Sequence, residues 1–200
     1  MASRRENRTM RQAETALLVI DVQVSIMDGN GDEPSPAYRR DEVLALIDAL
    51  LTKARAANVP VIYLQHDHAS FAPMQPGADG WHIHPAVAPT PGELVIRKRA
   101  SDGFYATSLR GELDARGVTH LVIVGAETEY CVDTTVRRAL SLDYDVTLVS
   151  DAHTTGFNGR SPVAEVIVHH NEVLANLPHP KHEIRVVPAA EIAFSAAVPV

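Results

Sequence analysis

The sequence predicts an α/β fold in which helices cover both faces of a mainly parallel, six-stranded sheet. Two observations predict it: short runs rich in Val and Ile recur along the chain, and amphipathic segments of helical period separate them. Strands that alternate with helices in this way form right-handed crossovers, and therefore a three-layer α-β-α arrangement similar to the Rossmann fold. A chain of 200 residues can bury one continuous core. We predict a flexible tail over residues 1–13 and a single domain over residues 14–200.

The predicted strands are short and apolar, as expected for strands that are buried on both faces. The segment Val118–Val124 is typical, because it is rich in Val and Ile and ends at a glycine. Pro60 lies near the start of its segment, where a strand tolerates proline. The six predicted strands cover residues 15–20, 59–65, 94–97, 118–124, 145–150 and 183–187.

The predicted helices begin and end at typical capping residues. The segment from Asp41 to about Ala57 places its apolar side chains on one face. Residues 104–116 form a predicted helix that ends before Gly117. Ser161–Pro162 is typical of a helix start and predicts a helix to about residue 177. We also predict that Thr128 caps a helix whose first turn contains Cys131.

Two glycine- and proline-rich segments are predicted to lack regular structure. Residues 22–40 form a predicted loop. Residues 66–92 are also irregular, and an irregular segment of this length in a compact domain usually covers or lines a site.

Composition excludes several classes of protein. The net charge of −7 at pH 7 gives no electrostatic footprint for nucleic acid. The single cysteine excludes an internal disulfide and favours a reducing compartment, so we expect a cytoplasmic protein. We expect no membrane association, because the chain has neither a signal-peptide core nor about 20 consecutive apolar residues.

Three reactive side chains occur where predicted strands end: Asp21, Lys98 and Cys131. In open parallel sheets, ligands bind beyond the carboxyl ends of the strands. A sulfur nucleophile, a carboxylate and a cation supply what covalent hydrolysis requires. A helix N-terminus would favour the Cys131 thiolate over the thiol. Taken singly, each residue also fits a structural role: an inert buried cysteine, a turn-forming aspartate and a solvated lysine.

Three blocks of the sequence resemble the signature blocks of the isochorismatase-like cysteine hydrolases. They are Leu17–Gln23, Val95–Lys98 followed by Phe104 and Thr107–Leu109, and Gly125–Val132. The blocks occur in the family's order, and the resemblance extends from about residue 14 to residue 177. This superfamily includes nicotinamidases and N-carbamoylsarcosine amidohydrolases.

The resemblance implies a role for each of these residues. Cys131 would be the nucleophile, Asp21 the general base and Lys98 the cation that organises the pair. It also implies a cis peptide bond between Ala126 and Glu127, with the N–H groups of Glu127 and Cys131 forming an oxyanion hole. We therefore expect hydrolysis of a C–N bond in a small amide, ureide or carbamoyl compound through a thioester acyl-enzyme.

Two alternatives remain within the same fold. An isochorismatase-type vinyl-ether hydrolase would need no thiol, and a non-catalytic binding member would keep the sheet without the reaction. Cys131 favours the amidohydrolase. No Gly-x-Gly-x-x-Gly follows the first predicted strand, and the expected chemistry needs no organic cofactor.

Nicotinamidases of the resembled family bind a divalent metal through an Asp-x-His pair and later histidines. Here His66 stands where the carboxylate should be, His68 follows it, and His84 lies in a Trp-x-x-His segment. Because this pattern is incomplete, we predict no metal, and some other small amide becomes a better candidate substrate than nicotinamide.

The predicted substrate contacts are Gln23, which follows the base, and the aromatic side chains Trp81, Phe104 and Tyr105. Pockets for small ligands have mainly apolar walls with a few polar groups. The resemblance also implies a homo-oligomer, either a dimer or a tetramer, with a small molecule as the only other partner.

Overall fold

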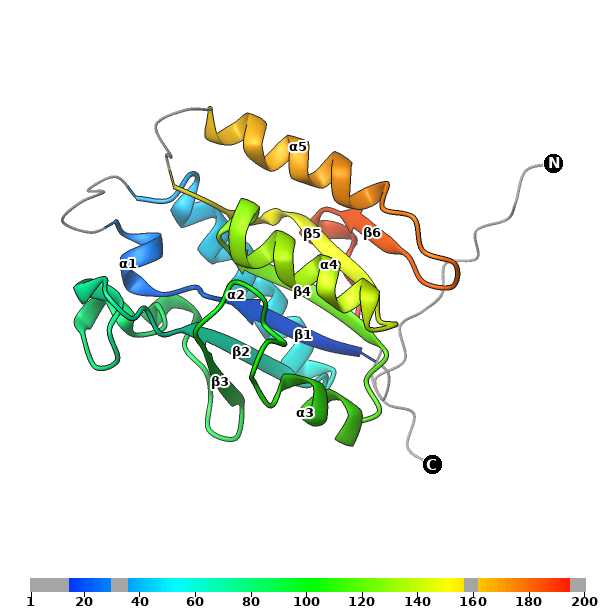
Figure 1. Ribbon diagram of the computed structural model, residues 1–200, viewed down its shortest axis with the longest axis horizontal. Helices are drawn as coiled ribbons and strands as arrows, with labels where there is room; N and C mark the ends of the chain where they lie inside the picture. The colour runs from blue at the N-terminus through cyan, green and yellow to red at the C-terminus, as the bar shows by residue number, and fades with distance from the viewer. Residues whose placement is uncertain (1–14, 30–35, 157–161, 195–200) are drawn as a thin grey trace.

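Six strands form one sheet in the order β3-β2-β1-β4-β5-β6 in the computed structural model, which describes residues 15–29, 36–156 and 162–194 (Figure 1). Every neighbouring pair of strands is parallel, so the sheet is entirely parallel, whereas the sequence predicted a mainly parallel one. The strands are β1 (Thr15–Ile20), β2 (Val61–His66), β3 (Leu94–Lys98), β4 (His120–Ala126), β5 (Asp145–Thr154) and β6 (Ile184–Val187). The predicted fold class is confirmed. The predicted tail over residues 1–13 lies outside the described residues.

Helices cover both faces of the sheet, as Figure 1 shows. In β1, Leu17 and Val19 belong to the hydrophobic cluster that includes α2, while Ala16, Leu18 and Ile20 belong to the cluster that includes α3, α4 and α5. This alternation follows from the period of two along a strand. The described helices are α1 (Val24–Met27), α2 (Arg40–Ala56), α3 (Leu109–Ala115), α4 (Asp133–Ser141) and α5 (Val163–Ala175).

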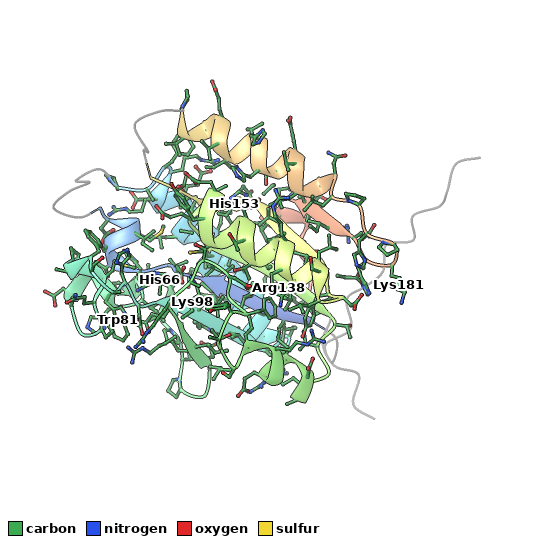
Figure 2. All side chains as sticks on the ribbon, in the orientation of Figure 1. His66, Trp81, Lys98, Arg138, His153 and Lys181 are labelled. Atoms are coloured by element: carbon green, nitrogen blue, oxygen red, sulfur yellow. The ribbon has the colours of Figure 1, made fainter. Side chains whose placement is uncertain are left out.

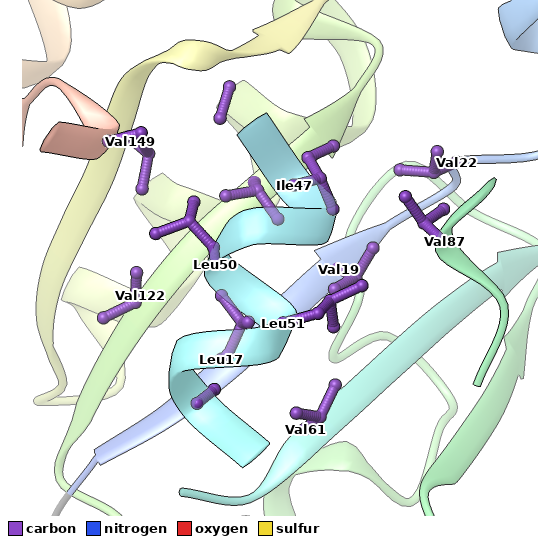
Figure 3. Close-up of a cluster of buried hydrophobic side chains, with 14 of the residues drawn as sticks. Leu17, Val19, Val22, Ile47, Leu50, Leu51, Val61, Val87, Val122 and Val149 are labelled. Atoms are coloured by element: carbon purple, nitrogen blue, oxygen red, sulfur yellow. The ribbon is translucent and has the colours of Figure 1, made fainter. Parts of the chain in front are cut away.

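The apolar face of α2 forms most of one core layer. Ile47, Leu50 and Leu51 are fully buried and pack over Leu17 and Val19 of the central strand (Figure 3). Each fully buried side chain of this size contributes roughly 1.5–3 kcal/mol of transfer free energy. The predicted start and end of this helix are correct to within one residue.

Two predicted segments are wrong. The helix predicted over residues 104–116 is helical only in α3. Before α3 the chain turns, because Asp102 accepts a hydrogen bond from the Phe104 N–H and the Thr107 hydroxyl donates to the Gly103 carbonyl. The segment 22–40 is not simply a loop, because it contains the single helical turn α1.

Other boundaries shift at the carboxyl edge of the sheet. β5 continues to Thr154, so His153 lies within the strand and not beyond it. β2 includes His66, and the irregular segment after it contains three short 3₁₀ turns, Ala72–Met74, Asp79–Trp81 and Pro85–Val87. The predicted cap Ser161 lies outside the described residues. No described helix has the length and apolar character needed to cross a membrane.

The strand order reverses between β1 and β4, because β1 connects to β2 on one side and β4 connects to β5 on the other. In an open parallel sheet the crevice at such a switch point lies beyond the carboxyl ends of the strands and is the usual ligand site. Asp21 and Cys131 follow the two strands that border this point.

Candidate active site

Asp21, Lys98 and Cys131 converge at the carboxyl edge of the sheet. The Lys98 ammonium lies 2.5 Å from Oδ2 of Asp21 and 3.2 Å from Sγ of Cys131. The Cys131 sulfur and a carboxylate oxygen of Asp21 lie within 4.8 Å of each other. The side chains of Lys98 and Asp21 are 0% exposed, so this ion pair is held away from bulk water. The predicted meeting of the three residues is confirmed.

Lys98 is the last residue of β3 and contacts four groups. Besides Asp21 and Cys131, it lies 3.1 Å from the Ala100 carbonyl and 3.3 Å from Nδ1 of His66. Burial lowers the pKa of Lys98, but the neighbouring Asp21 and Cys131 raise it by more, so the ammonium form is stabilised. Lys98 is therefore a fixed buried cation, and not part of a solvated basic face.

Asp21 directly follows β1 with φ of 49°, in the left-handed region that aspartate adopts more readily than most residues. In the described part of the chain, its carboxylate is approached by the Lys98 ammonium and by the Cys131 thiol. A carboxylate with free lone pairs beside a thiol can accept a proton from it.

Cys131 lies in a π-helical turn, Thr128–Val132, and not in the first turn of an α-helix. The Glu127 carbonyl accepts the N–H groups of Tyr130 and Val132, while the Thr128 hydroxyl contacts His153 and does not cap the helix. The predicted cap is therefore wrong. A wider turn between β4 and α4 places the sulfur against Asp21 and Lys98.

The resting form of Cys131 is the thiol. Burial, followed by the charge of Asp21, raises its pKa to about 12, and the opposing effect of Lys98 is smaller. The expected stabilisation of the thiolate by the helix N-terminus is wrong, because desolvation and a nearby anion outweigh it. Cys131 therefore keeps its proton until a base removes it.

Close packing between β1 and β4 fixes the approach to Cys131. Gly125 has φ of 125°, and a Cβ there would lie 2.0 Å from the Ile20 carbonyl oxygen, so no other residue fits. The next peptide bond but one, between Ala126 and Glu127, is cis. Glu127 and Cys131 then both reach the wall of one cavity.

A cavity of about 470 Å³ opens beside the cysteine. Its wall combines polar groups from the strand ends with apolar side chains from the segments after β1 and β2. The described residues that line it are Asp21, Ser25, Ile26, Gly29, His66, His68, Phe71, Met74, Ser101, Glu127, Tyr130, Cys131 and Gly156.

The four predicted substrate contacts do not line this cavity. Gln23 is fully buried, accepts the His66 N–H through Oε1 and donates to the carbonyls of His66 and Trp81. The Trp81 indole donates to Asp67. Gln23 thus hydrogen-bonds the main chain of His66, which lines the cavity, and Trp81 hydrogen-bonds Asp67, which does not.

The other two predicted contacts lie elsewhere. Phe104 is 9% exposed and stacks on Tyr144 in the hydrophobic core, with ring centroids 5.9 Å apart. Tyr105 is 67% exposed and borders a separate surface hollow. Aromatic residue type alone did not distinguish core, surface and pocket.

Ser25, Phe71 and Tyr130 line the cavity but were not predicted from the sequence. Tyr130 directly precedes the cysteine, and Ser25 follows the base by one helical turn, so their sequence positions were available signals. Phe71 belongs to the long segment after β2, which was expected to line a site without any residue being singled out.

The histidines do not form the metal site known from nicotinamidases. In the described residues, the only group of potential ligand atoms within 4.8 Å of one another is Asp21, His66 and Cys131. The Lys98 ammonium already contacts all three. His68 Nδ1 instead accepts the N–H groups of Ser70 and Phe71. These residues do not fit a metal ion, because a fixed cation occupies the position it would take.

The sequence is similar to a known protein family and to several characterised proteins. The family model described as the isochorismatase domain matches residues 15–164. Streptothricin hydrolase of Streptomyces noursei is 44% identical over 140 residues, which cover 70% of this chain and 49% of that protein. The ureidoacrylate amidohydrolase RutB of Stutzerimonas stutzeri is 29% identical over 189 residues, covering 78% of this chain and 76% of that protein.

A crystal structure described as an isochorismatase from Pseudomonas putida KT2440 superposes with a TM-score of 0.79, at 29% identity and 94% coverage of both chains. The chain spans about half the length of the two streptothricin hydrolases it matches, 49% of one and 54% of the other.

Proposed function

This chain belongs to the isochorismatase family, and from that premise we propose that it is a cysteine hydrolase that cleaves a C–N bond of a small amide, ureide or carbamoyl compound. The observation that carries the proposal is the buried contact of Lys98 with both Asp21 and Cys131. The names of the matched streptothricin hydrolase and ureidoacrylate amidohydrolase support hydrolysis as the reaction class.

In the first half-reaction, Asp21 accepts the Cys131 proton as the sulfur attacks the substrate carbonyl carbon. The N–H groups of Glu127 and Cys131 stabilise the oxyanion in this proposal, as donors of this kind do in other acyl transfers. The C–N bond then breaks, and Asp21 returns the proton to the departing nitrogen. An amine or ammonia leaves, and the acyl group remains on sulfur as a thioester.

In the second half-reaction, water attacks the thioester carbonyl while Asp21 accepts its proton. The C–S bond breaks, a carboxylic or carbamic acid leaves, and Asp21 returns the proton to the sulfur. The Lys98 ammonium balances the negative charge that moves between sulfur and carboxylate, because both anions form within a desolvated site.

The test is a screen for ammonia release from small amides and ureides, followed by variants assayed with the best substrate. Cys131→Ala should abolish turnover, and Asp21→Asn should lower kcat by about 10²–10⁴. Asp133→Asn is the matched control, because this carboxylate lies two residues after Cys131 and pairs with Arg137 instead.

The same variants separate the competing readings. Turnover that survives Cys131→Ala would refute the thioester route and favour a vinyl-ether hydrolase, which needs no thiol. Failure of every amide and ureide would favour a binding protein that retains the fold.

A further inference from the structure

Among the described residues that line the cavity, His66 contacts the buried lysine and yet has no role in the proposed proton transfers. It ends β2 directly opposite Lys98 of β3, and the two side chains lie together in Figure 2. One ring nitrogen lies within 4.8 Å of both the Cys131 sulfur and an Asp21 oxygen. The ring therefore borders the space where a substrate must lie.

The contact with Lys98 fixes the tautomer of His66. Nδ1 lies 3.3 Å from the Lys98 ammonium, which can only donate, so Nδ1 accepts. Burial, and then the charge of Lys98, lower the pKa of His66 below 6.5, so the ring is neutral at pH 7. Its one proton is therefore on Nε2, which has no hydrogen-bond partner in the part of the chain that the structure describes.

The main chain of His66 is held by the side chain of Gln23. The Gln23 amide accepts the His66 N–H at 2.8 Å and donates to the His66 carbonyl at 3.1 Å. A donor with a fixed main chain loses little conformational entropy when it binds a ligand. The main chain of His66, which lines the cavity, is thus held in place by Gln23.

Ser25 contributes a second polar side chain to the wall of the same cavity. Ser25 is 4% exposed, and its hydroxyl has no hydrogen-bond partner among the described residues. A buried polar group without a partner destabilises the fold, and a ligand that hydrogen-bonds to it removes that cost. Ser25 belongs to α1, so the two polar groups approach the cavity from different segments.

We propose that His66 determines substrate specificity by donating a hydrogen bond from Nε2, with Ser25 as a second polar contact, to an acceptor atom next to the scissile carbonyl. This inference rests on the proposed function. It names the substrate class as amides or ureides with a second oxygen or nitrogen acceptor near the reacting carbon. A purely aliphatic amide would leave both polar groups unpaired and bind more weakly.

The probes are methoxyacetamide and butyramide, which have similar shapes and differ by one ether oxygen. Each is tested for its ability to protect Cys131 from iodoacetamide, measured by mass spectrometry of the intact chain, in which only one cysteine can react. In the wild type, methoxyacetamide should protect at an about tenfold lower concentration than butyramide. This readout measures binding and does not require turnover.

Variants then test the residue. In His66→Phe the preference for methoxyacetamide should disappear, whereas His66→Gln should keep part of it, because an amide can accept from Lys98 and still donate. Ser25→Ala should reduce the preference less than His66→Phe. Thermal unfolding of each variant checks that the fold is retained.

Equal protection by the two compounds in the wild type, or protection by neither, overturns the proposal. So does a preference that persists in His66→Phe. Absence of ammonia release with the preference intact would instead count against the hydrolase alone, so the two failures are distinguishable.

Discussion

His153 gives the most direct test of how burial controls the chemistry of this fold. It lies in β5 and is 1% exposed. Asn171 donates through Nδ2 to the Ser150 carbonyl, so its Oδ1 faces His153 Nε2 at 2.9 Å. Nε2 therefore carries the proton, and Nδ1 accepts from the Thr128 hydroxyl at 2.9 Å. The neutral ring is fully paired, and it connects α5 to the turn that contains Cys131.

The expected loss of stability follows from the pKa of His153. Burial lowers the pKa of His153 from 6.5 to about 4. The unfolded chain therefore binds a proton near pH 6.5, whereas the folded chain binds it only near pH 4. Stability must fall as pH decreases through this window and level off below it, by about 3 kcal/mol for this one group.

The assay is urea unfolding of the wild type and His153→Gln at several values between pH 7.5 and pH 4. The free energy of unfolding of the wild type should fall by about 3 kcal/mol more than that of the variant over this range. Other titrating groups are common to both chains and cancel in the comparison. His169→Gln, at an exposed position on α5, should behave like the wild type. Parallel pH profiles for the wild type and His153→Gln would refute the reasoning.

Three further predictions follow from particular contacts. Gly125→Ala should lower the free energy of unfolding by about 3 kcal/mol or more, because its Cβ would overlap the Ile20 carbonyl. The control Gly111→Ala should stabilise α3 by about 0.5–1 kcal/mol, because its Cβ meets nothing within 4 Å. Equal urea midpoints for the two variants would contradict this prediction. Asp21→Asn should lower the pKa of Cys131, because the aspartate raises it. Iodoacetamide should therefore alkylate the thiol faster at pH 9 even though kcat falls, and slower alkylation would contradict this. The dimer or tetramer implied by the family resemblance stays a prediction, and light scattering at micromolar concentration would decide it.

The strands and the long helix were predictable because their patterns are local. Buried strands need continuous Val and Ile, and α2 needs apolar residues at helical spacing, whatever else the chain contains. The segment before α3 was predicted wrongly because side chains such as Asp102 and Thr107 hydrogen-bond the backbone there and replace the helix with turns.

The meeting of Asp21, Lys98 and Cys131 could be predicted because parallel strands bring their carboxyl ends to one edge, and the three blocks mark those ends. The walls of the cavity could not be predicted in the same way. Trp81, Phe104 and Tyr105 have the right residue types, yet one hydrogen-bonds a residue outside the cavity wall, one fills the core and one is exposed. Which side of a residue faces a cavity depends on loops whose course has no periodic pattern.

By itself, the sequence determined the α/β fold, the three reactive residues and the edge of the sheet where they meet. Only the tertiary structure decided that Cys131 rests as a thiol, that among the described residues His66 is the one histidine whose ring lies within 4.8 Å of Asp21 and Cys131, and that its Nδ1 contacts Lys98. The reason is physical: a proton's affinity for a group depends on burial and on charges a few ångströms away, and those neighbours are distant in the chain.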